Sequence, residues 1–248
     1  MKNKLLLFIL LIVVLTITVF SANYEKKFYK EVPIDSIKNF KFQNVNGPIV
    51  IEPSKTGKIV VDAIIKGKNK YNVEKTNIDI SKSFKTLSVE VNLPHKSKVN
   101  VAFYLKLPET LNVKVSSVNG KISSEGNYKF FSYTTVNGRI IVNNDIGAGK
   151  IKTVNGSSEI HTTKRLTGNL YVSTVNGSVR VYLGRADNLS VEAKTINGSV
   201  KIEHPDLKVT GKKSFFPFFP GKVKGEGKNP EYKLSVSTIN GSIRILNE

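Results

Sequence analysis

A tripeptide of Val or Ile followed by Asn and Gly recurs seven times along the 248-residue chain, and it constrains the fold more than any other feature. Its Asn and Gly residues are Asn46 and Gly47, Asn119 and Gly120, Asn137 and Gly138, Asn155 and Gly156, Asn176 and Gly177, Asn197 and Gly198, and Asn240 and Gly241. Successive glycines are 73, 18, 18, 21, 21 and 43 residues apart. Such a short and nearly constant period indicates a repeat protein. The last interval is close to twice 21, which predicts one coil that has lost its Asn-Gly.

The residues on both sides of each tripeptide alternate between apolar and polar. Every second residue is apolar from Leu189 to Ala193 and again from Val200 to Ile202, around the turn at Asn197. Asn-Gly is a strong turn signal because both residues tolerate positive φ, and alternation of period two is typical of strands with one buried face. No window beyond the N-terminal segment shows helical periodicity, so we expect an all-β fold without a long helix.

A period of 18 to 21 residues fits one coil of a β-solenoid. Equivalent residues of neighbouring coils would then stack about 4.8 Å apart, with Val, Ile and Leu filling the interior. Stacked Asn side chains can form a hydrogen-bonded ladder along the corner. We therefore assign the Asn-Gly pairs a structural role in the turns rather than a role in ligand binding.

The repeat resembles a known family. The stretch Thr-Val-Asn-Gly-Ser-Val-Arg-Val around Gly177, the segment from Leu105 to Gly120, and the end of the chain from Gly225 to Gly241 are similar to the bacterial "putative adhesin" family of exported proteins with DUF4097-type β-strand repeats. The resemblance covers roughly Phe40 to Ile245. It implies a right-handed β-helix-like solenoid at the cell envelope, and it brings no catalytic residues and no cofactor.

The chain divides into an N-terminal segment, 1–22, and a single domain, 23–248. Within the domain we expect an irregular, partly antiparallel β-layer over 23–110 that covers the first coil, Asn-Gly coils over 111–248, and an aromatic insertion at 212–224. Polar turns separate the alternating or β-rich stretches of the layer, which are Lys58 to Ile65, Asn77 to Ile80, Thr86 to Val91 and Val99 to Leu107.

The N-terminal segment is typical of export. Lys2 and Lys4 precede a run without charge from Leu5 to Phe20, and the small residues Ser21 and Ala22 follow. This 16-residue run lies between the usual core of a signal peptide and the roughly 20 residues that span a bilayer. A cleaved signal peptide and a retained membrane anchor through residues 5–20 both stay open. Either way we expect residues 23–248 outside the cytoplasm, as a periplasmic, cell-surface or secreted protein.

The composition argues against several kinds of catalytic or metal site. There is no Cys, which excludes disulfides, thiolate nucleophiles and iron-sulfur clusters, and the three His are scattered. We expect no metal, no cofactor and no enzyme activity. Two pairs of titratable residues are weak candidates for a catalytic site: Glu159 with His161 on one strand, and Glu192 with Glu203 across a turn. They leave a polysaccharide-active β-helix enzyme as a remote alternative.

The charge is strongly positive, with 38 Lys and Arg against 19 Asp and Glu, and only five of the basic residues are Arg. Lysine is a hydrated point charge without the bidentate geometry of arginine, so we expect diffuse, salt-sensitive attraction to anions. Stacked coils would align the candidate basic face, which consists of Arg139, Arg180, Lys201 and Arg244. The alternative is a solvated face that reflects only a Lys-rich composition.

A second candidate surface lies between Gly198 and Gly241, where four Phe fall within five residues beside two Pro. The prolines predict a loop or an irregular edge. One interpretation is an exposed tip that enters a membrane interface or a partner groove, and a second is that the aromatic rings cover the flank or the C-terminal end of the solenoid. A third is that the segment is disordered. The residues of this candidate loop are Lys212, Lys213, Phe215, Phe216, Phe218, Phe219 and Lys222.

These observations together predict a non-catalytic, exported envelope protein with an adhesin-like or scaffolding role. Its partner would be an anionic envelope polymer, a membrane surface or another protein, bound through an extended solenoid face, and open sheet edges would allow homo-oligomers. We expect no nucleic-acid partner, because export separates the chain from cytoplasmic nucleic acid and no RNA-binding or DNA-binding motif is present. The alternative is an envelope-stress or signalling component in which the solenoid is a passive spacer.

Overall fold

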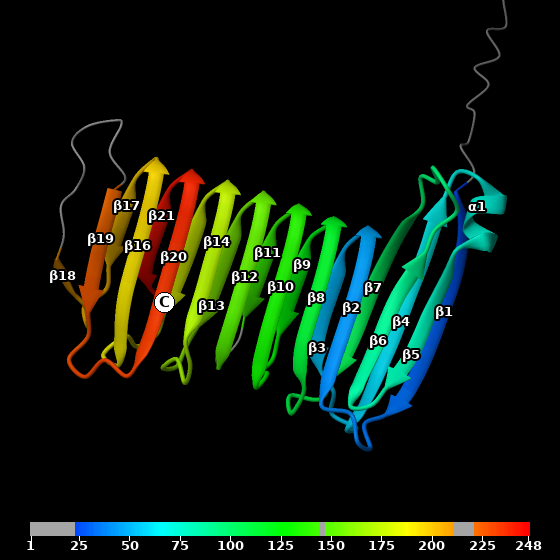
Figure 1. Ribbon diagram of the computed structural model, residues 1–248, viewed down its shortest axis with the longest axis horizontal. Helices are drawn as coiled ribbons and strands as arrows, with labels where there is room; N and C mark the ends of the chain where they lie inside the picture. The colour runs from blue at the N-terminus through cyan, green and yellow to red at the C-terminus, as the bar shows by residue number, and fades with distance from the viewer. Residues whose placement is uncertain (1–22, 144–146, 211–220) are drawn as a thin grey trace, which may run out of the picture.

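The computed structural model describes residues 23–143, 147–210 and 221–248, which form two large β-sheets (Figure 1). Sheet A contains, in spatial order, β1 (Tyr24–Pro33), β4 (Lys58–Gly67), β7 (Asn100–Leu107), β3 (Ile49–Pro53), β9 (Ile122–Glu125), β11 (Ile140–Asn143), β13 (Ser158–Thr162), β15 (Val179–Leu183), β21 (Ile243–Asn247) and β17 (Val200–Glu203). Sheet B contains β18 (Lys208–Thr210), β19 (Gly221–Glu226), β16 (Leu189–Asn197), β20 (Tyr232–Asn240), β14 (Leu170–Asn176), β12 (Ala148–Asn155), β10 (Phe130–Asn137), β8 (Asn112–Asn119), β2 (Asn39–Asn46), β6 (Thr86–Asn92) and β5 (Asn77–Ser83).

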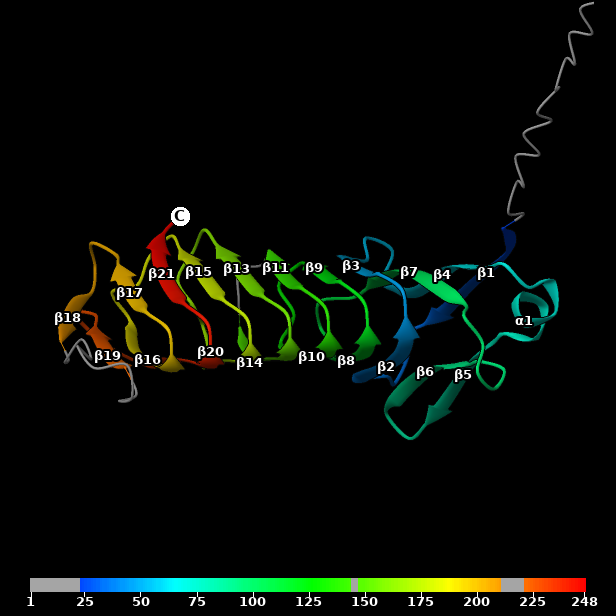
Figure 2. The same ribbon diagram turned by 90° about the horizontal axis from the view of Figure 1, so that it is seen from above.

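Each coil of the repeat contributes one strand to each sheet. The chain runs along a strand of sheet B, turns at Asn-Gly and continues as a shorter strand of sheet A, and Figure 2 shows the two rows of strands joined in this way. Neighbouring coils pair in parallel without any shift, as where Asn137 of β10 lies opposite Asn119 of β8 and Asn155 of β12. The predicted all-β, solenoid-like fold is therefore confirmed.

The C-terminal coil lies where the sequence did not predict it. Strand β20 pairs in parallel with both β14 and β16, and β21 pairs with both β15 and β17. The last coil thus fills the space between the two coils that precede it in sequence. The prediction of a coil without Asn-Gly in the 43-residue interval is wrong. That interval instead contains β18 and β19, an antiparallel pair that extends sheet B beyond β16 and thereby covers the β16 edge.

The N-terminal layer is partly antiparallel, as predicted. Strands β1, β4 and β7 form antiparallel pairs in sheet A, and β5 pairs antiparallel with β6 in sheet B. The four predicted strands match β4, β5, β6 and β7 to within three residues at each end. The sequence analysis missed β1 and the short helix α1 (Lys70–Lys75), which begins where the side chain of Asn69 accepts a hydrogen bond from the backbone N–H of Asn72 at 3.1 Å. Six residues are too few to show a helical period.

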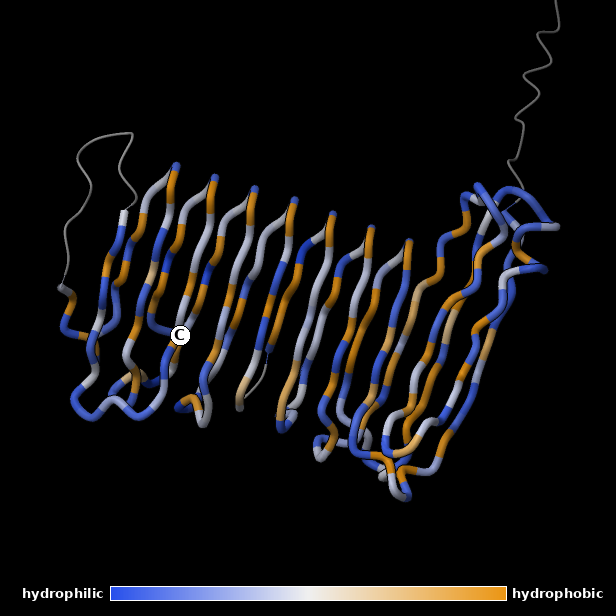
Figure 3. The backbone as a smooth tube through the Cα atoms, in the orientation of Figure 1, coloured by the Kyte–Doolittle hydropathy of each residue, from blue (hydrophilic) through white to orange (hydrophobic). Residues whose placement is uncertain are grey.

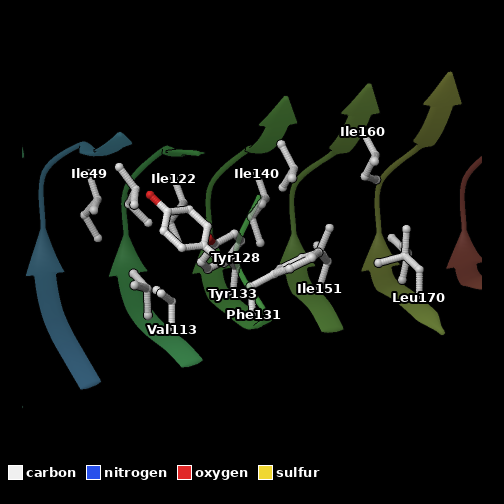
Figure 4. Close-up of a cluster of buried hydrophobic side chains, with 14 of the residues drawn as sticks. Ile49, Val113, Ile122, Tyr128, Phe131, Tyr133, Ile140, Ile151, Ile160 and Leu170 are labelled. Atoms are coloured by element: carbon white, nitrogen blue, oxygen red, sulfur yellow. The ribbon is translucent and has the colours of Figure 1, made fainter. Parts of the chain in front are cut away.

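The core lies between the two sheets and consists of every second residue of each strand. Figure 3 shows the resulting alternation of hydropathy along the chain. Figure 4 shows the ring of Phe131 among the apolar side chains of this core. Phe131 lies opposite Gly149, where a Cβ would be only 2.0 Å from the Phe131 ring, so this position of the inner row requires glycine. The hydroxyls of buried Tyr133 and Ser124 are 2.8 Å apart and form a hydrogen bond across the sheets. Side chains thus occupy the core between the sheets, and the outer faces of the two sheets are the extended surfaces of the solenoid.

Candidate binding surface

The seven Asn residues of the repeat form one uninterrupted ladder along a corner of the solenoid. In each step the Nδ2 of one Asn donates to the Oδ1 of the Asn before it in the ladder, over 2.8 to 3.0 Å. The order along the ladder is Asn46, Asn119, Asn137, Asn155, Asn176, Asn240 and Asn197. The Asn side chains therefore bind one another, as the stacking argument predicts.

The glycines are required chiefly by close stacking. A Cβ on Gly156 would lie 1.9 Å from the carbonyl oxygen of Gly138. At each repeat glycine from Gly120 onward, an added Cβ would likewise lie 1.8 to 2.1 Å from the carbonyl oxygen of the glycine stacked beside it. None of the seven Asn has a positive φ. The prediction that Asn is needed for a positive φ in the turn is therefore wrong. Each Asn is the last residue of an extended strand, and its side chain stacks on the Asn of the neighbouring coil.

The Thr residue before most tripeptides completes this corner from the inside. The hydroxyls of five buried Thr donate to the glycine carbonyl of the neighbouring coil over 3.0 to 3.4 Å, from Thr135, Thr153, Thr174, Thr195 and Thr238. The Val or Ile that precedes the Asn in each of the seven tripeptides points outward. Six of these seven residues are 38 to 49 % exposed. The corner therefore pairs its Asn and Thr side chains internally, while the buried hydroxyl of Ser117, at the Thr position of one coil, has no hydrogen-bond partner in the described residues, and it presents a row of aliphatic side chains.

The candidate basic face is on sheet A and is broken by an acid. Arg244 lies between Arg180 and Lys201 in one row, because β21 lies between β15 and β17. The next residue in that row is Glu159. Arg139 lies outside the row, and its guanidinium forms an ion pair with Glu159. The structure brings the four residues onto one sheet, with their positive charge partly neutralised.

Of the two candidate catalytic pairs, the structure separates Glu192 from Glu203 and brings Glu159 and His161 into contact. Glu192 is on sheet B and Glu203 on sheet A, so this pair is not a site. Glu159 accepts a hydrogen bond from His161 at 3.1 Å, and this bond together with the Arg139 guanidinium lowers the pKa of Glu159. His161 also contacts Glu248 at 3.2 Å and stacks on Tyr182. No group of three or more His, Asp and Glu in the described residues is arranged to hold a metal ion.

Most of the candidate loop lies outside the described residues. This applies to Lys212, Lys213, Phe215, Phe216, Phe218 and Phe219. Lys222 is in β19, where its ammonium group contacts the carboxylate of Glu192 at 3.0 Å. Lys194 and Lys233 contact the same carboxylate at 2.5 and 2.9 Å. These contacts connect β16, β19 and β20 and hold the covering hairpin in place.

Sequence analysis missed the outer face of sheet B. Its six neighbouring strands β2, β8, β10, β12, β14 and β20 contain no Asp or Glu. The same coils in sheet A include Glu52, Glu125 and Glu159. We call the outer side of these six strands the acid-free face. Counting acids by strand, rather than over the whole chain, would have found it.

Three lysines at the middle of the acid-free face have no ion-pair partner in the described part of the chain. They are Lys114 of β8 and Lys150 and Lys152 of β12, all exposed between buried residues. The remaining lysines of these strands, Lys41 and Lys233, contact Glu90 and Glu192 on the flanking strands. Ser and Thr fill the outward positions between the lysines, such as Ser132 in the row between Lys114 and Lys150. The face therefore presents ammonium and hydroxyl groups together with the exposed rings of Phe130 and Tyr171.

Among the described residues, no helix has the length and apolar character needed to cross a membrane.

A comparison with curated proteins gives no match. Among solved structures, a "putative cell adhesion protein" from Clostridium sporogenes ATCC 15579 is similar, with 14% identity, 91% of this chain and 100% of that chain covered, and a TM-score of 0.54. A "putative adhesin" from Bacteroides fragilis NCTC 9343 matches with 14% identity over 89% and 97% of the two chains and a TM-score of 0.35.

The likeness to the Clostridium structure extends over nearly the whole chain and shows that the fold is shared. The family model described as Toastrack DUF4097 matches residues 110–246, which include six of the seven coils with an Asn-Gly turn. Those residues contain the Asn ladder, the stacked glycines and most of the acid-free face. The chain therefore belongs to the Toastrack DUF4097 family.

Proposed function

We propose that the chain is an exported, non-catalytic, adhesin-like protein that binds a linear polyanion of the cell envelope along the acid-free face. The observation that carries this proposal is the run of six neighbouring strands without a carboxylate, beside a sheet whose coils carry both signs of charge. Packing does not require it, because outward positions on sheet B accept Glu at Glu90 and Glu192.

The geometry of the face favours an extended polymer over a small ligand. The strands repeat about every 4.8 Å along the solenoid. A chain that runs across the strands would therefore meet Lys114 and, two strands further along the same row, Lys150, with Lys152 beside it in the next outward row. Ammonium groups donate hydrogen bonds to anionic oxygens, and the neighbouring hydroxyls both donate and accept. Because all these groups are exposed, binding would weaken steeply with salt.

The site residues support binding more than catalysis. General acid catalysis by a carboxyl group requires a raised pKa, whereas the pKa of Glu159 is lowered. The lowered pKa therefore argues against Glu159 as the general acid of a polysaccharide-active enzyme. Export rests on the N-terminal segment, and the adhesive role draws on the name of the Clostridium protein. Right-handed winding of the coils stays a prediction.

The test is a salt titration of binding to two chemically different linear polyanions, inorganic polyphosphate and alginate, with dextran as the neutral control. We expect both polyanions to bind, with affinity that falls as salt rises. The triple variant Lys114→Gln, Lys150→Gln and Lys152→Gln should weaken binding about tenfold or more, since each charge near a polyanionic surface is worth on the order of 1 kcal/mol.

The matched control removes three positive charges from sheet A, in the variant Arg180→Gln, Lys201→Gln and Arg244→Gln. We expect it to retain nearly all of the affinity, since these residues lie beside Glu159 and Glu203. Equal losses in the two variants would show attraction to net charge alone. A loss confined to the sheet A variant would place the binding face there and refute the proposal.

A further inference from the structure

A separate cavity of about 710 Å³ lies at the N-terminal end of the solenoid. It opens where the start of β1, the end of β4, the start of β7 and α1 meet (Figure 1). The register confirms this meeting point, because Tyr24 lies opposite Gly67 and Lys66 lies opposite Asn100. Its volume is within the range of small-ligand sites, and it is far along the solenoid from the middle of the acid-free face.

The lining of this cavity is almost entirely lysine and asparagine. Four Lys and four Asn line it, with Gly67 and Val99: Lys66, Lys68, Lys96, Lys98, Asn23, Asn69, Asn72 and Asn100. No carboxylate is among the lining residues. Lys66 forms an ion pair with Glu25 at 3.0 Å, while the other three lysines have no ion-pair partner in the described residues. Three lysines without an ion-pair partner in the described residues, lining one cavity, favour an anionic occupant.

One of these lysines is held in an unfavourable backbone conformation. Lys96 has a φ of 56°, in the left-handed region. It is the third residue of a turn closed by a hydrogen bond of 3.1 Å from the N–H of Ser97 to the carbonyl of Pro94. Positive φ at that position of a turn favours Gly or Asn, and residues held in such conformations cluster at functional sites. Asp35 and Phe84 also have positive φ but do not line the cavity. The lysine at this position is explained if its ammonium group serves the cavity.

The chemistry of the lining indicates the class of ligand. Ammonium groups only donate hydrogen bonds, so they suit an oxyanion such as phosphate, whereas carboxamides both donate and accept and therefore suit hydroxyl groups. We propose that this cavity binds a polyol phosphate, of which glycerol phosphate is the simplest form. That group occurs as a free metabolite and as the headgroup of phosphatidylglycerol. The proposal does not depend on polyanion binding by the acid-free face.

Calorimetric titration of the full chain with glycerol 1-phosphate, inorganic phosphate and glycerol tests the site. We expect glycerol 1-phosphate to bind about tenfold more tightly than inorganic phosphate, and glycerol not to bind. Lys96→Gly is the decisive variant, because it removes one ammonium group while providing the residue that the turn prefers. It should weaken glycerol 1-phosphate at least fivefold with an unchanged or higher melting temperature. The double variant Lys68→Gln and Lys98→Gln should weaken it further.

Vesicles distinguish the two sources of the ligand. Binding to phosphatidylglycerol vesicles that exceeds binding to phosphatidylcholine vesicles, and that falls to the phosphatidylcholine level in Lys96→Gly, would support the lipid headgroup. Binding of glycerol 1-phosphate without that excess would support a soluble ligand at the same site. The triple variant of Lys114, Lys150 and Lys152 should keep its affinity for glycerol 1-phosphate. Absence of glycerol 1-phosphate binding by the native chain, or equal binding by Lys96→Gly, would overturn the proposal.

Discussion

The Asn-Gly corner and the acid-free face lie on the same strands of sheet B, yet their residues are determined by different forces. At the corner every Asn, Gly and Thr has a partner in the neighbouring coil, so stacking accounts for the motif. On the face, a few residues earlier in each strand, Lys114, Lys150 and Lys152 have no ion-pair partner among the described residues. The most regular part of the sequence is thus structural, and the less regular part is the candidate for function.

This comparison predicts that changes at the corner reduce stability without a specific effect on binding, and that changes on the face do the reverse. The largest effect should come from Gly156→Ala, whose Cβ would lie 1.9 Å from a backbone oxygen. We expect a loss of about 3 kcal/mol in the free energy of unfolding, since overpacking of rigid structure costs about that much. Urea denaturation measures it.

The matched control for that variant is Gly57→Ala in the N-terminal layer. Gly57 has a φ of +69° but open space around its Cβ position. Its substitution should cost only the left-handed backbone strain, about 1–2 kcal/mol. Equal losses at the two positions would contradict the stacking explanation of the corner.

A smaller effect is expected within the ladder. Asn137→Ala removes two side-chain hydrogen bonds, to Asn119 at 2.8 Å and from Asn155 at 3.0 Å. Asn46, at the end of the ladder, takes part in one, from Asn119 at 2.9 Å. At about 0.5–1.5 kcal/mol for each bond, Asn137→Ala should destabilise the chain by about 1–3 kcal/mol and Asn46→Ala by about half as much. If the end position costs as much as the middle, the ladder does not act through its hydrogen bonds.

Glu192 provides a pH-dependent comparison. Hydrogen bonds from Lys194, Lys233 and Lys222 hold the pKa of Glu192 far below its usual range. A lowered native pKa stabilises the fold above the unfolded value of 4.5, and this stabilisation is lost as the pH falls toward the native value. Glu192→Gln should therefore lower stability by about 1 kcal/mol at pH 7, on the scale of exposed ion pairs, and the difference should shrink below about pH 4.

The control for Glu192 is Glu203→Gln, which removes a carboxylate with one lysine partner, Lys201, at 2.7 Å. Both of those side chains are more than half exposed. Thermal melts at pH 7 and pH 3 should show almost no change for Glu203→Gln. A pH-independent loss in Glu192→Gln would mean that packing rather than charge holds the hairpin.

The smallest stability effect should come from the acid-free face itself. The triple variant Lys114→Gln, Lys150→Gln and Lys152→Gln removes exposed side chains without ion-pair partners in the described residues. Surface changes of this kind usually stay within about 0.5 kcal/mol each. The melting temperature should therefore be unchanged while polyanion affinity falls. A fall of several degrees would show that these lysines stabilise the sheet.

Much of the fold could be predicted from sequence because its signals are local. Alternation around Asn197 and the regular spacing of the glycines predict parallel coils and the ladder. The insertion of β20 between β14 and β16 could not be predicted, since every coil has a similar apolar pattern and the order in space depends on which edge is free when the chain returns. The six residues of α1 are too short for a period. The acid-free face was missed because net charge averages over both sheets.

The most direct test of the central claim is a lysine-reactivity footprint read by mass spectrometry, with and without alginate at physiological salt. The account predicts strong protection of Lys114, Lys150 and Lys152, and little change at Lys106 and Lys201, which are exposed on sheet A. Uniform protection of both sheets, or protection confined to sheet A, would contradict the assignment of the acid-free face as the binding surface.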